Sequence, residues 1–360
     1  MSSTLSALQK NLLTWFRRNR RELPWRRNRD PYRIWIAEIM LQQTRIAAVV
    51  PYYERFMERF PTVESLAGTR QDSVLKLWSG LGYYSRARNL HRAAQEIVTK
   101  HDGKFPRDLE AVLRLPGIGS YTAAAVLSIA YDVPLAVLDG NVARVIARLD
   151  AIRGDLRVPA RWKQLASRAQ ELLARESAGD WNQALMELGE TICTPRSPRC
   201  DVCPIALACR ARKLGLTDEI PAPREKRASV RQRIAAAILR DPGGRTLLIR
   251  DPGAHDDVLF SRMWQFPALE VTRNPAAELE VHLRETLALT APLSLEPLPV
   301  ARHGVTFRNI TLLPFLVRVA MLPRRARTRI LPLNHLSRPS HLPVSSATRK
   351  IAAAFANAKP

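Results

Sequence analysis

Four cysteines form the clearest chemical motif in this 360-residue chain. They are Cys193, Cys200, Cys203 and Cys209, and the sequence contains no other cysteine. Four thiolates spaced this closely can surround one iron–sulfur cluster. A structural zinc site usually has two close pairs separated by a longer loop, and a disulfide pair requires an oxidising compartment. We therefore expect the four cysteines to bind a 4Fe–4S cluster.

A second candidate for chemistry is Glu38. It falls in an apolar stretch, with Ile34 and Trp35 one helical turn before it and Leu41 one turn after it. Burial among such side chains disfavours the charged form of a carboxyl group, so we expect a raised pKa and a proton that Glu38 can donate. The alternative is a surface glutamate on an amphipathic helix.

Asp139 immediately precedes a predicted helix that continues to Leu149. The helix dipole favours a negative charge at this place, so an ionised Asp139 can face developing positive charge. An aspartate here is also an ordinary helix N-cap, and the two roles are compatible.

A tight connection between two predicted helices is a candidate phosphate-binding site. The helical patterns are Arg107–Leu115 and Ser120–Tyr131, and Pro116–Gly119 joins them. Gly117 and Gly119 can take backbone conformations closed to other residues, so their amide groups can face outward. Amides beside a helix N-terminus bind phosphate, although a plain helix–helix turn has the same pattern.

The formal net charge of +23 predicts a polyanionic partner. DNA is the obvious candidate because phosphates attract Lys and Arg through counterion release, although a basic surface alone explains part of the excess. The sequence has no apolar run near the roughly twenty residues that a membrane span requires. It also shows no secretory signal, so we expect a soluble protein of the bacterial cytoplasm or nucleoid.

Residues 1–216 are predicted to be mostly helical. Segments such as Tyr32–Val50, Ser85–Lys100 and Arg161–Glu176 carry apolar residues at three- and four-residue spacing. Residues 217–232 are polar and contain proline, as linkers do.

Residues 233–354 are predicted to form a smaller α/β domain. Ile234–Leu239 and Thr246–Ile249 have the pattern of two strands joined by a turn. A short amphipathic helix is expected at Ala276–Leu289 and a further strand at Ile310–Val319.

The hairpin, Asp139 and the cysteine loop follow one another as in the helix-hairpin-helix glycosylase superfamily that includes endonuclease III, which the chain resembles. Three further motifs resemble the adenine DNA glycosylase (MutY) branch, namely Leu23–Arg26, Glu38–Thr44 and Leu81–Arg88. The resemblance covers nearly all of residues 8–210. It implies a six-helix lobe at about 25–132 and a cluster lobe built from about 1–24 and 133–216.

This resemblance implies roles for four residues. Glu38 is expected to act as a general acid on the adenine ring, and Asp139 to stabilise cationic charge on the deoxyribose. Tyr121 and Asn141 are expected to orient water, sugar and Asp139. Bifunctional endonuclease III-like enzymes carry a lysine nucleophile at the position of Tyr121. A phenol cannot form a Schiff base, so we expect a monofunctional glycosylase.

The resemblance also implies contacts with DNA. A target base within the stack cannot be reached, so it must be flipped out. Gln43 and Tyr83 match residues that fill the resulting gap, whereas a helix-surface glutamine and a core tyrosine are the alternatives. Trp25 and Arg26 match residues of the adenine pocket, although tryptophan is more often simply buried.

In adenine glycosylases a C-terminal domain of the Nudix (MutT) fold checks for 8-oxoguanine, and residues 233–354 are similar in layout. The glutamate-rich box of a Nudix hydrolase is reduced here to fragments such as Glu278 and Glu280, so pyrophosphatase activity is not expected. The family's lesion-sensing loop usually reads Phe-Ser-His. Here Phe307 is followed by Arg308 and Asn309, which stay candidates for contact with a purine edge.

These features predict a monomeric base excision repair enzyme that removes adenine mispaired with 8-oxoguanine or guanine from double-stranded DNA. An endonuclease III-like glycosylase for oxidised pyrimidines and a non-catalytic DNA-binding module are the alternatives. Tyr121 and the additional C-terminal domain disfavour the first alternative, and the presence of both Glu38 and Asp139 disfavours the second.

Overall fold

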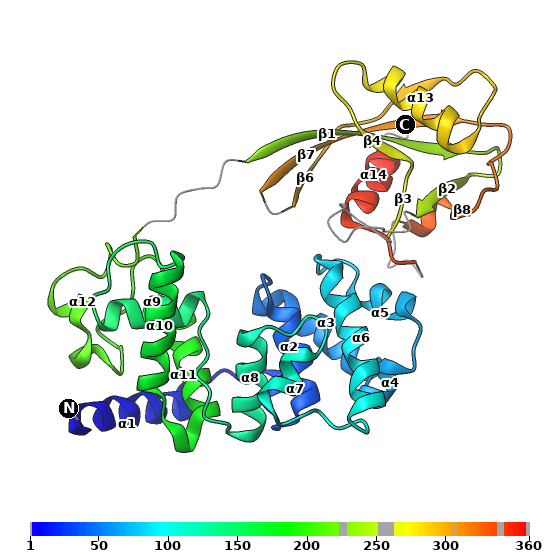
Figure 1. Cartoon of the computed structure of the whole chain (residues 1–360). Helices are drawn as coiled ribbons and strands as arrows, with labels where there is room; N and C mark the ends of the chain where they lie inside the picture. The colour runs from blue at the N-terminus through cyan, green and yellow to red at the C-terminus, as the bar shows by residue number, and fades with distance from the viewer. Residues whose placement is uncertain (1, 223–228, 251–262, 306, 337–341, 358–360) are drawn as a thin grey trace. The chain divides into compact units, whose positions relative to one another are not determined.

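The N-terminal part of the chain is helical, as its apolar spacing predicts (Figure 1). The structure is a computed structural model that describes residues 2–222, 229–250, 263–305, 307–336 and 342–357. The α-helices before the sheet are α1 (Ser2–Asn19), α2 (Pro31–Leu41), α3 (Ile46–Arg59), α4 (Val63–Ala67), α5 (Gln71–Trp78), α6 (Tyr84–Lys100), α7 (Leu109–Arg114), α8 (Ser120–Tyr131), α9 (Gly140–Leu149), α10 (Pro159–Leu172), α11 (Ala178–Thr191) and α12 (Arg210–Lys213). Short 3-10 turns occur at η1 (Pro24–Arg26), η2 (Arg175–Ser177) and η3 (Ala206–Ala208).

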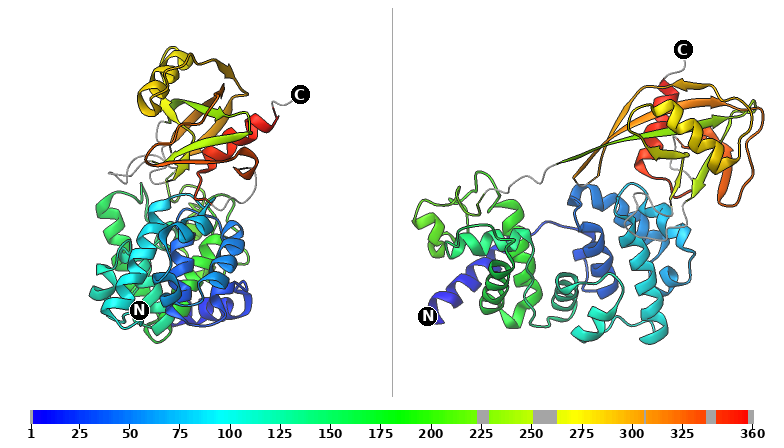
Figure 2. Two further views of the ribbon diagram at one scale, coloured as in Figure 1. Left: turned by 90° about the vertical axis from the view of Figure 1, so that its right-hand side faces the viewer. Right: turned by 45° about the horizontal axis from the view of Figure 1, so that its top comes forward.

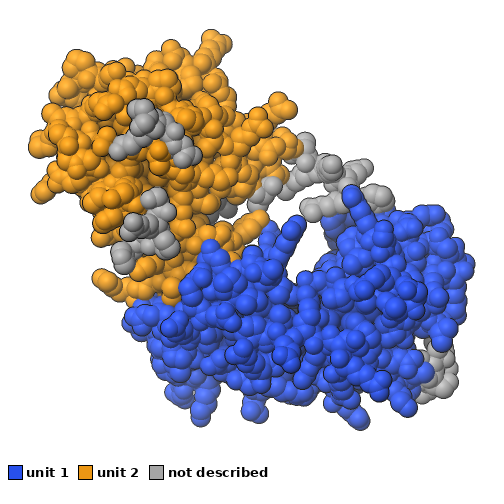
Figure 3. Space-filling model, turned by 180° about the vertical axis from the view of Figure 1, so that it is seen from behind, with its two compact units in different colours: residues 1–69, 89–225 blue, residues 70–88, 226–360 orange. Residues whose placement is uncertain are grey.

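The chain forms two units (Figure 3). The first contains residues 1–69 and 89–225, and the second contains residues 70–88 and 226–360. The predicted linker 217–232 includes residues 223–228, which lie outside the described residues, and its end is strand rather than linker because β1 begins at Val230. None of the described helices is long and apolar enough to span a lipid bilayer.

The single helix expected over Tyr32–Val50 is wrong, because the chain turns between α2 and α3. Helix α2 ends at Leu41 and α3 begins at Ile46. Gln43 has a left-handed backbone with φ of 58°, a conformation that costs a non-glycine residue about 1–2 kcal/mol. The apolar spacing continues across the turn, so the pattern alone did not reveal it.

Helix α2 is buried along most of its length. Asp30 caps its start by accepting a hydrogen bond from Tyr32 N (2.9 Å). Pro31 suits the first turn because no backbone donor is needed there. Apart from Glu38, the buried residues of α2 are apolar or aromatic. A carboxyl group in such surroundings is costly unless it is protonated or paired.

The expected hairpin joins α7 to α8. Gly117 lies in the left-handed region (φ 78°), and a Cβ there would meet Asn89 Cβ at 2.6 Å. Gly119 has an extended backbone with φ of −96°, so the expected special conformation is wrong for this second glycine. A Cβ at Gly119 would have no heavy atom within 4 Å. Gly117 is therefore required by the turn, whereas Gly119 leaves the start of α8 open.

Helix α11 packs against α1, α8 and α9, and its apolar side chains share a core with α1, α9 and α10. Gly179 permits the close approach to α8. A Cβ at this position would lie 2.6 Å from Ser128 O and 2.9 Å from Ile129 Cα, and both of these are backbone atoms. Since backbone cannot rotate away as a side chain can, a larger residue must push the two helices apart.

We expect Gly179→Ala to lower the free energy of unfolding by about 1–3 kcal/mol, because the added methyl group overpacks the α8–α11 contact. Urea unfolding followed by circular dichroism measures the change. Gly140→Ala is the matched control, because a Cβ at Gly140 meets no heavy atom within 4 Å. Equal urea midpoints for the two variants would contradict the close packing of α11.

A mixed sheet forms the centre of the second unit, which confirms the α/β class predicted for residues 233–354. Its strands are β1 (Val230–Arg240), β2 (Arg245–Arg250), β3 (Trp264–Gln265), β4 (Ala268–Glu270), β5 (Leu295–Pro297), β6 (Ala301–Val305), β7 (Arg308–Arg318) and β8 (Thr328–Pro332). The main path runs β3-β2-β1-β7-β5, with β4 on β1, β6 on β7 and β8 on β2. Strands β1 and β7 are parallel, from Val230 opposite Arg308 to Arg240 opposite Arg318.

Helices cover both faces of this sheet (Figure 2). Helix α13 (Pro275–Leu287) packs against one face, where Ala235 and Ala237 of β1 point. Helix α14 (Ser346–Asn357) packs against the other, with Ala236 and Ile238. A strand covered on both sides has no solvent face, which explains the continuous apolar run of β1.

Candidate active site and cysteine loop

A cavity of about 390 Å³ lies in the first unit. It is formed by η1, α2, the turn after α2, the start of α8, the start of α9 and one face of α11. The cavity brings together seven of the residues singled out in the sequence, namely Trp25, Arg26, Glu38, Gln43, Tyr121, Asp139 and Asn141.

Glu38 is buried in the cavity wall, with 7% of its surface exposed. Burial raises the pKa of its carboxyl group to about 7, and the nearby negative charge of Asp139 adds to this rise. The hydroxyl of Tyr121 and the positive charge of Arg26 act in the opposite direction. The raised pKa predicted from the apolar neighbours is therefore found, and a carboxyl group of this kind can donate a proton near neutral pH.

Asp139 caps α9 in the predicted manner. Its Oδ1 accepts a hydrogen bond from Val142 N (2.7 Å), and its Oδ2 accepts one from Asn141 Nδ2 (3.4 Å). Burial raises the pKa of Asp139 above its ordinary value, although these donors and the charge of Arg144 oppose the rise. The same carboxyl group lines the cavity, so capping and exposure to the pocket coexist.

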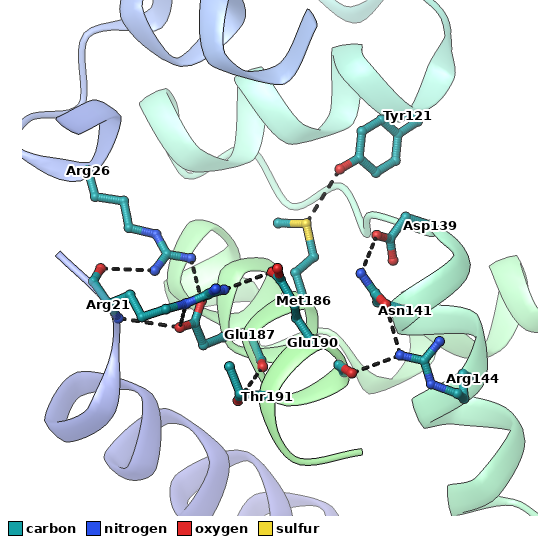
Figure 4. Close-up of polar contacts among 11 residues, drawn as sticks. Arg21, Arg26, Tyr121, Asp139, Asn141, Arg144, Met186, Glu187, Glu190 and Thr191 are labelled. Carbon is teal, nitrogen blue, oxygen red and sulfur yellow. Dashed lines mark hydrogen bonds and ion pairs between the residues drawn. The ribbon is translucent and has the colours of Figure 1, made fainter. Parts of the chain in front are cut away.

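Polar contacts lead from Asp139 through Asn141 to Arg144 (Figure 4), and Arg144 also contacts the backbone of Cys193. Arg144 Nη2 donates to Asn141 Oδ1 (2.8 Å) and to Gly189 O (2.7 Å). The Nε of the same guanidinium donates to Cys193 O (2.8 Å). Arg144 is buried, so one side chain fixes both the orientation of Asn141 and the backbone at the first cysteine.

Tyr121 stands at the start of α8 and points its hydroxyl into the cavity. Tyr121 Oη donates to Met186 Sδ (3.5 Å). Burial raises the pKa of Tyr121 well above its ordinary value, and the charges of Glu38 and Asp139 raise it further. The hydroxyl therefore stays protonated and is a neutral donor in the cavity that Glu38 and Asp139 also line.

Trp25 and Gln43 both line this cavity, but Trp25 is buried and Gln43 is exposed. Trp25 is 7% exposed and packs edge-on against Tyr53, with ring centroids 5.2 Å apart. It is therefore a core residue that also contributes to the pocket wall. Gln43 is exposed at the turn between α2 and α3, so the alternative of a glutamine on a helix surface is wrong.

Helix α11 supplies cavity residues that the sequence did not reveal. Gln183, Met186, Glu187 and Glu190 all line the cavity. Their spacing of three, four and seven residues places them on one face of the helix. Three of these four residues are polar, and their helical spacing was the signal available in the sequence.

Other predicted DNA-contacting residues lie outside the cavity. Gly117 and Gly119 lie in the hairpin of the first unit. Tyr83 belongs to the second unit, is 38% exposed and has a left-handed backbone with φ of 49°. Arg86 lies over its ring at 5.3 Å from the centroid, so the alternative of a core tyrosine is wrong.

Phe307 lies in the turn between β6 and β7, beside residue 306, which is outside the described residues, and Arg308 and Asn309 are the first two residues of β7. The guanidinium of Arg308 lies 5.0 Å from the ring centroid of Phe307. Asn309 is exposed and pairs with Gly304 across the hairpin. The three residues thus share one hairpin end of the second unit.

Two acidic residues of α13, Glu278 and Glu280, are engaged in local contacts. Glu278 accepts hydrogen bonds from three backbone amides just before the helix, those of Thr272, Arg273 and Asn274. Glu280 forms an ion pair with Arg284 one turn later (2.8 Å). These contacts are those of a capped and internally paired surface helix.

The four cysteines fit a cluster by their placement and donor chemistry. Cys193, Cys200, Cys203 and Cys209 line one small, mostly apolar cavity, and all four thiols are free. Burial, together with repulsion from the other three thiols, raises the pKa of Cys203 to about 11. Thiols that line one apolar pocket favour metal binding, because it removes their protons. In the described ranges no three His, Cys, Asp or Glu side chains, these thiols included, are arranged to hold a single metal ion, so the four thiols suit an iron–sulfur cluster better than one cation.

Arg148 of α9 binds backbone carbonyl groups in and beyond the cysteine loop. It is 2% exposed, and its guanidinium donates to the carbonyl oxygens of Ile220 (2.7 Å), Thr194 (2.7 Å) and Pro195 (3.3 Å). Its Nη1 also lies 3.3 Å from Cys193 Sγ. These contacts tie the start of the cysteine loop and the segment after α12 to α9.

Arg148→Met is expected to destabilise the first unit by about 3 kcal/mol or more, because it leaves several buried carbonyl oxygens without donors. The expected results are a lower urea midpoint and a lower iron content of the purified protein. Arg196→Met is the control, since Arg196 is an exposed arginine of the same loop. Equal iron content in both variants would show that Arg148 does not organise the loop.

Comparison with known proteins places these features in a family. Residues 36–174 match the HhH-GPD superfamily of base excision DNA repair proteins. Residues 193–206 match the iron–sulfur binding domain of endonuclease III, which confirms the predicted 4Fe–4S cofactor, and Cys209 lies just beyond the matched residues.

Curated relatives are adenine DNA glycosylases, which confirms the predicted resemblance. The rat protein (Rattus norvegicus) is 33% identical over 346 residues, covering 82% of this chain and 66% of its own length. The human protein (Homo sapiens) is 44% identical over 218 residues, covering 58% of this chain and 40% of its own. The chain thus spans less than two thirds of the length of these curated relatives.

Among solved structures, a thermostable thymine-DNA glycosylase is 31% identical, with a TM-score of 0.54, over 59% of this chain and 98% of that one. Endonuclease III in a non-covalent complex with DNA, at 24% identity and a TM-score of 0.51 over 60% of this chain and 98% of that one, shows the same fold. On these matches, the chain belongs to the HhH-GPD superfamily of base excision DNA repair proteins.

Proposed function

We propose that this chain is a monofunctional DNA glycosylase that removes adenine mispaired with 8-oxoguanine or guanine from double-stranded DNA. One observation carries the proposal: Glu38, which holds a proton near neutral pH, and Asp139 line a single cavity. Similarity to curated adenine DNA glycosylases supports adenine as the base that is removed.

In the proposed reaction Glu38 gives its proton to the adenine ring. The electron pair of the N-glycosidic bond then leaves with the base, and positive charge develops on the deoxyribose. Asp139 faces this charge, and water adds to the sugar to give an abasic site. Tyr121 and Asn141 orient the sugar, the water and Asp139. A phenol in place of a lysine allows no Schiff base, so the strand is not cut.

The flipped nucleotide is held by residues around the cavity. We assign Trp25 and Arg26 to the wall that receives adenine, and Gln43 and Tyr83 to the gap left in the stack. The exposure and left-handed backbone of both Gln43 and Tyr83 support this, because a residue at the tip of a tight turn can enter the duplex. Gly117 and Gly119 present amides to the phosphate backbone.

We assign the second unit to recognition of the opposite base. Its residues Phe307, Arg308 and Asn309 combine an aromatic ring with hydrogen-bond donors at one hairpin end. The proposed domain bounds are 1–216 for the glycosylase domain, with its six-helix lobe at about 25–132, and 233–354 for the lesion-recognition domain.

The 4Fe–4S cluster supports the loop that carries Arg196, Arg199 and Arg210. These three arginines face DNA phosphates. The protein acts as a monomer.

Base release from defined duplexes tests the proposal. The duplexes contain adenine opposite 8-oxoguanine, adenine opposite guanine, or an oxidised pyrimidine, and each reaction is analysed with and without alkali. Strand cleavage only after alkali, on the two adenine duplexes alone, is the expected result. Faster release opposite 8-oxoguanine than opposite guanine supports the hairpin assignment, and equal rates contradict it.

Two other outcomes would overturn the proposal. Cleavage of the oxidised pyrimidine duplex without alkali would identify an endonuclease III-like enzyme. Tight binding to all duplexes with no base release would identify a DNA-binding module without catalysis.

A further inference from the structure

Glu187 of α11 is a buried carboxylate that the proposed mechanism does not use. Its side chain is 2% exposed. Glu187 Oε1 accepts from Arg21 Nε (2.6 Å), and Oε2 accepts from Arg21 Nη2 (3.0 Å) and from Arg26 Nη2 (2.9 Å). Figure 4 shows this carboxylate between the two guanidinium groups. Although burial raises the pKa of Glu187, hydrogen bonds from Arg21 and the charge of Arg26 bring it below its ordinary value, so Glu187 is ionised.

Arg26 is held on three sides. Its Nη2 donates to Glu187, its Nη1 donates to Arg21 O (3.1 Å), and its guanidinium lies over the ring of Phe16 at 5.5 Å from the centroid. Its side chain is 12% exposed and lines the same cavity as Glu38. The guanidinium therefore forms a fixed part of the wall assigned to the flipped base.

A cation at this place has two opposed effects on the reaction. It presents donors to a purine edge, and its charge favours the ionised form of any nearby carboxyl group. Glu38 is such a group, and it must keep its proton in order to donate it. The charge of Arg26 does act on Glu38 in this unfavourable direction.

We propose that Glu187 is a positioning residue that holds the Arg26 guanidinium against the cavity wall and offsets its charge, so that no uncompensated cation faces the general acid Glu38. This inference rests on the proposed function, since it assigns Glu187 a purpose in that reaction. A purely structural bridge between α11 and the segment before α2 is the competing explanation. Such a structural bridge would need only Arg21, which also binds Glu190 (2.7 Å), and would not need Arg26.

Few charged groups act on Glu38, so the direction in which each substitution moves the pKa of Glu38 is defined. Tyr121 of α8 contributes a neutral hydroxyl, Asp139 at the start of α9 contributes a negative charge, and Arg26 of η1 contributes the positive charge. Helix α11 contributes Glu187 and Glu190 to the cavity lining, and the other charged residues of the lining are Arg21 and Arg45. Without the Glu187 carboxylate, Arg26 loses a strong partner. Its positive charge is then no longer offset by Glu187 and lowers the pKa of Glu38 further.

The test is the pH dependence of single-turnover adenine release from a duplex with adenine opposite 8-oxoguanine. In Glu187→Gln the midpoint of the alkaline fall in rate is expected to move to lower pH by about one unit, the size of shift that a close charge produces. The rate at pH values above the midpoint then falls by about tenfold and recovers on acidification. A purely structural defect would lower the rate at every pH without moving the midpoint.

A second variant keeps the test decisive if Glu187→Gln does not fold. Arg26→Met removes the cation and leaves Glu187 paired with Arg21, so its midpoint is expected to move to higher pH, opposite to Glu187→Gln. Asp180→Asn is the matched control. Asp180 is another acidic residue of α11 paired with Arg17 (3.4 Å), but it does not line the cavity, so its midpoint should equal that of the unmodified protein.

The outcomes separate this inference from the proposed function. If the unmodified protein releases no adenine at any pH, the proposed function fails and the inference fails with it. If the unmodified protein is active but the midpoints of the folded Glu187 and Arg26 variants coincide with its own, only the inference fails. Opposite shifts in the two variants establish it.

Discussion

Replacing Glu38 with glutamine is expected to slow single-turnover adenine release by about 10²–10⁴-fold, the usual contribution of a general acid. Glutamine has nearly the same shape and can occupy the same buried position, but it has no acidic proton to give to the base. Binding to the mispaired duplex should change little. Rate measurements with excess enzyme, together with a binding titration, separate the two effects.

The pH profile provides an independent check of this assignment. The pKa of Glu38 is raised to about 7, so the acid is protonated below this pH and loses its proton above it. The rate of the unmodified protein should therefore fall as the pH rises through about 7, and Glu38→Gln should show no such fall. Glu54→Gln, at an exposed position of α3, is the control and should retain both rate and profile. Normal turnover in Glu38→Gln would remove the assignment.

Asp139→Asn is expected to reduce base release by about 10²–10³-fold, as is typical when one electrostatic contact with the transition state is lost. The substitution removes the negative charge of residue 139 and keeps its role as a helix cap. Asparagine caps a helix as well as aspartate does, so the hydrogen bond from Val142 N is kept and α9 should remain folded. Only the negative charge facing the sugar is removed.

The controls for Asp139→Asn are its stability and a second capping position. The thermal unfolding midpoint should match that of the unmodified protein to within a few degrees. Asp108→Asn, at the N-cap of α7, makes the same chemical change away from the cavity and should leave the rate unchanged. A large loss of stability in Asp139→Asn, with a proportionate loss of rate, would instead indicate a role limited to capping.

Much of the site could be predicted from the sequence because its signals are local. The cysteine spacing, the N-cap at Asp139 and the apolar surroundings of Glu38 all depend on residues within one or two turns. The class of the second unit was likewise visible, since its strand pair and the helix α13 follow their local periodicity.

Features that depend on distant contacts were not predicted. The turn at Gln42–Arg45 interrupts a continuous apolar pattern, because α2 and α3 bury different faces against different neighbours. The contribution of α11 to the cavity depends on its packing between α8 and α9, which no local pattern specifies. Glu187 in particular resembles a surface glutamate until its two arginine partners, far away in the sequence, are brought to it.

The parallel pairing of β1 and β7 has a consequence for how the second unit folds. These two strands form its longest strand pairing, yet β2 to β6 and α13 lie between them in the sequence. Contacts between segments so far apart form slowly, because the intervening loop must close first. During synthesis, the edge of β1 that pairs with β7 must therefore stay unpaired until β7 has left the ribosome, although β2 and β4 can pair with β1 earlier. A nascent chain that stops before Arg308 should be digested readily by protease after residue 229, whereas its helical part should already resist.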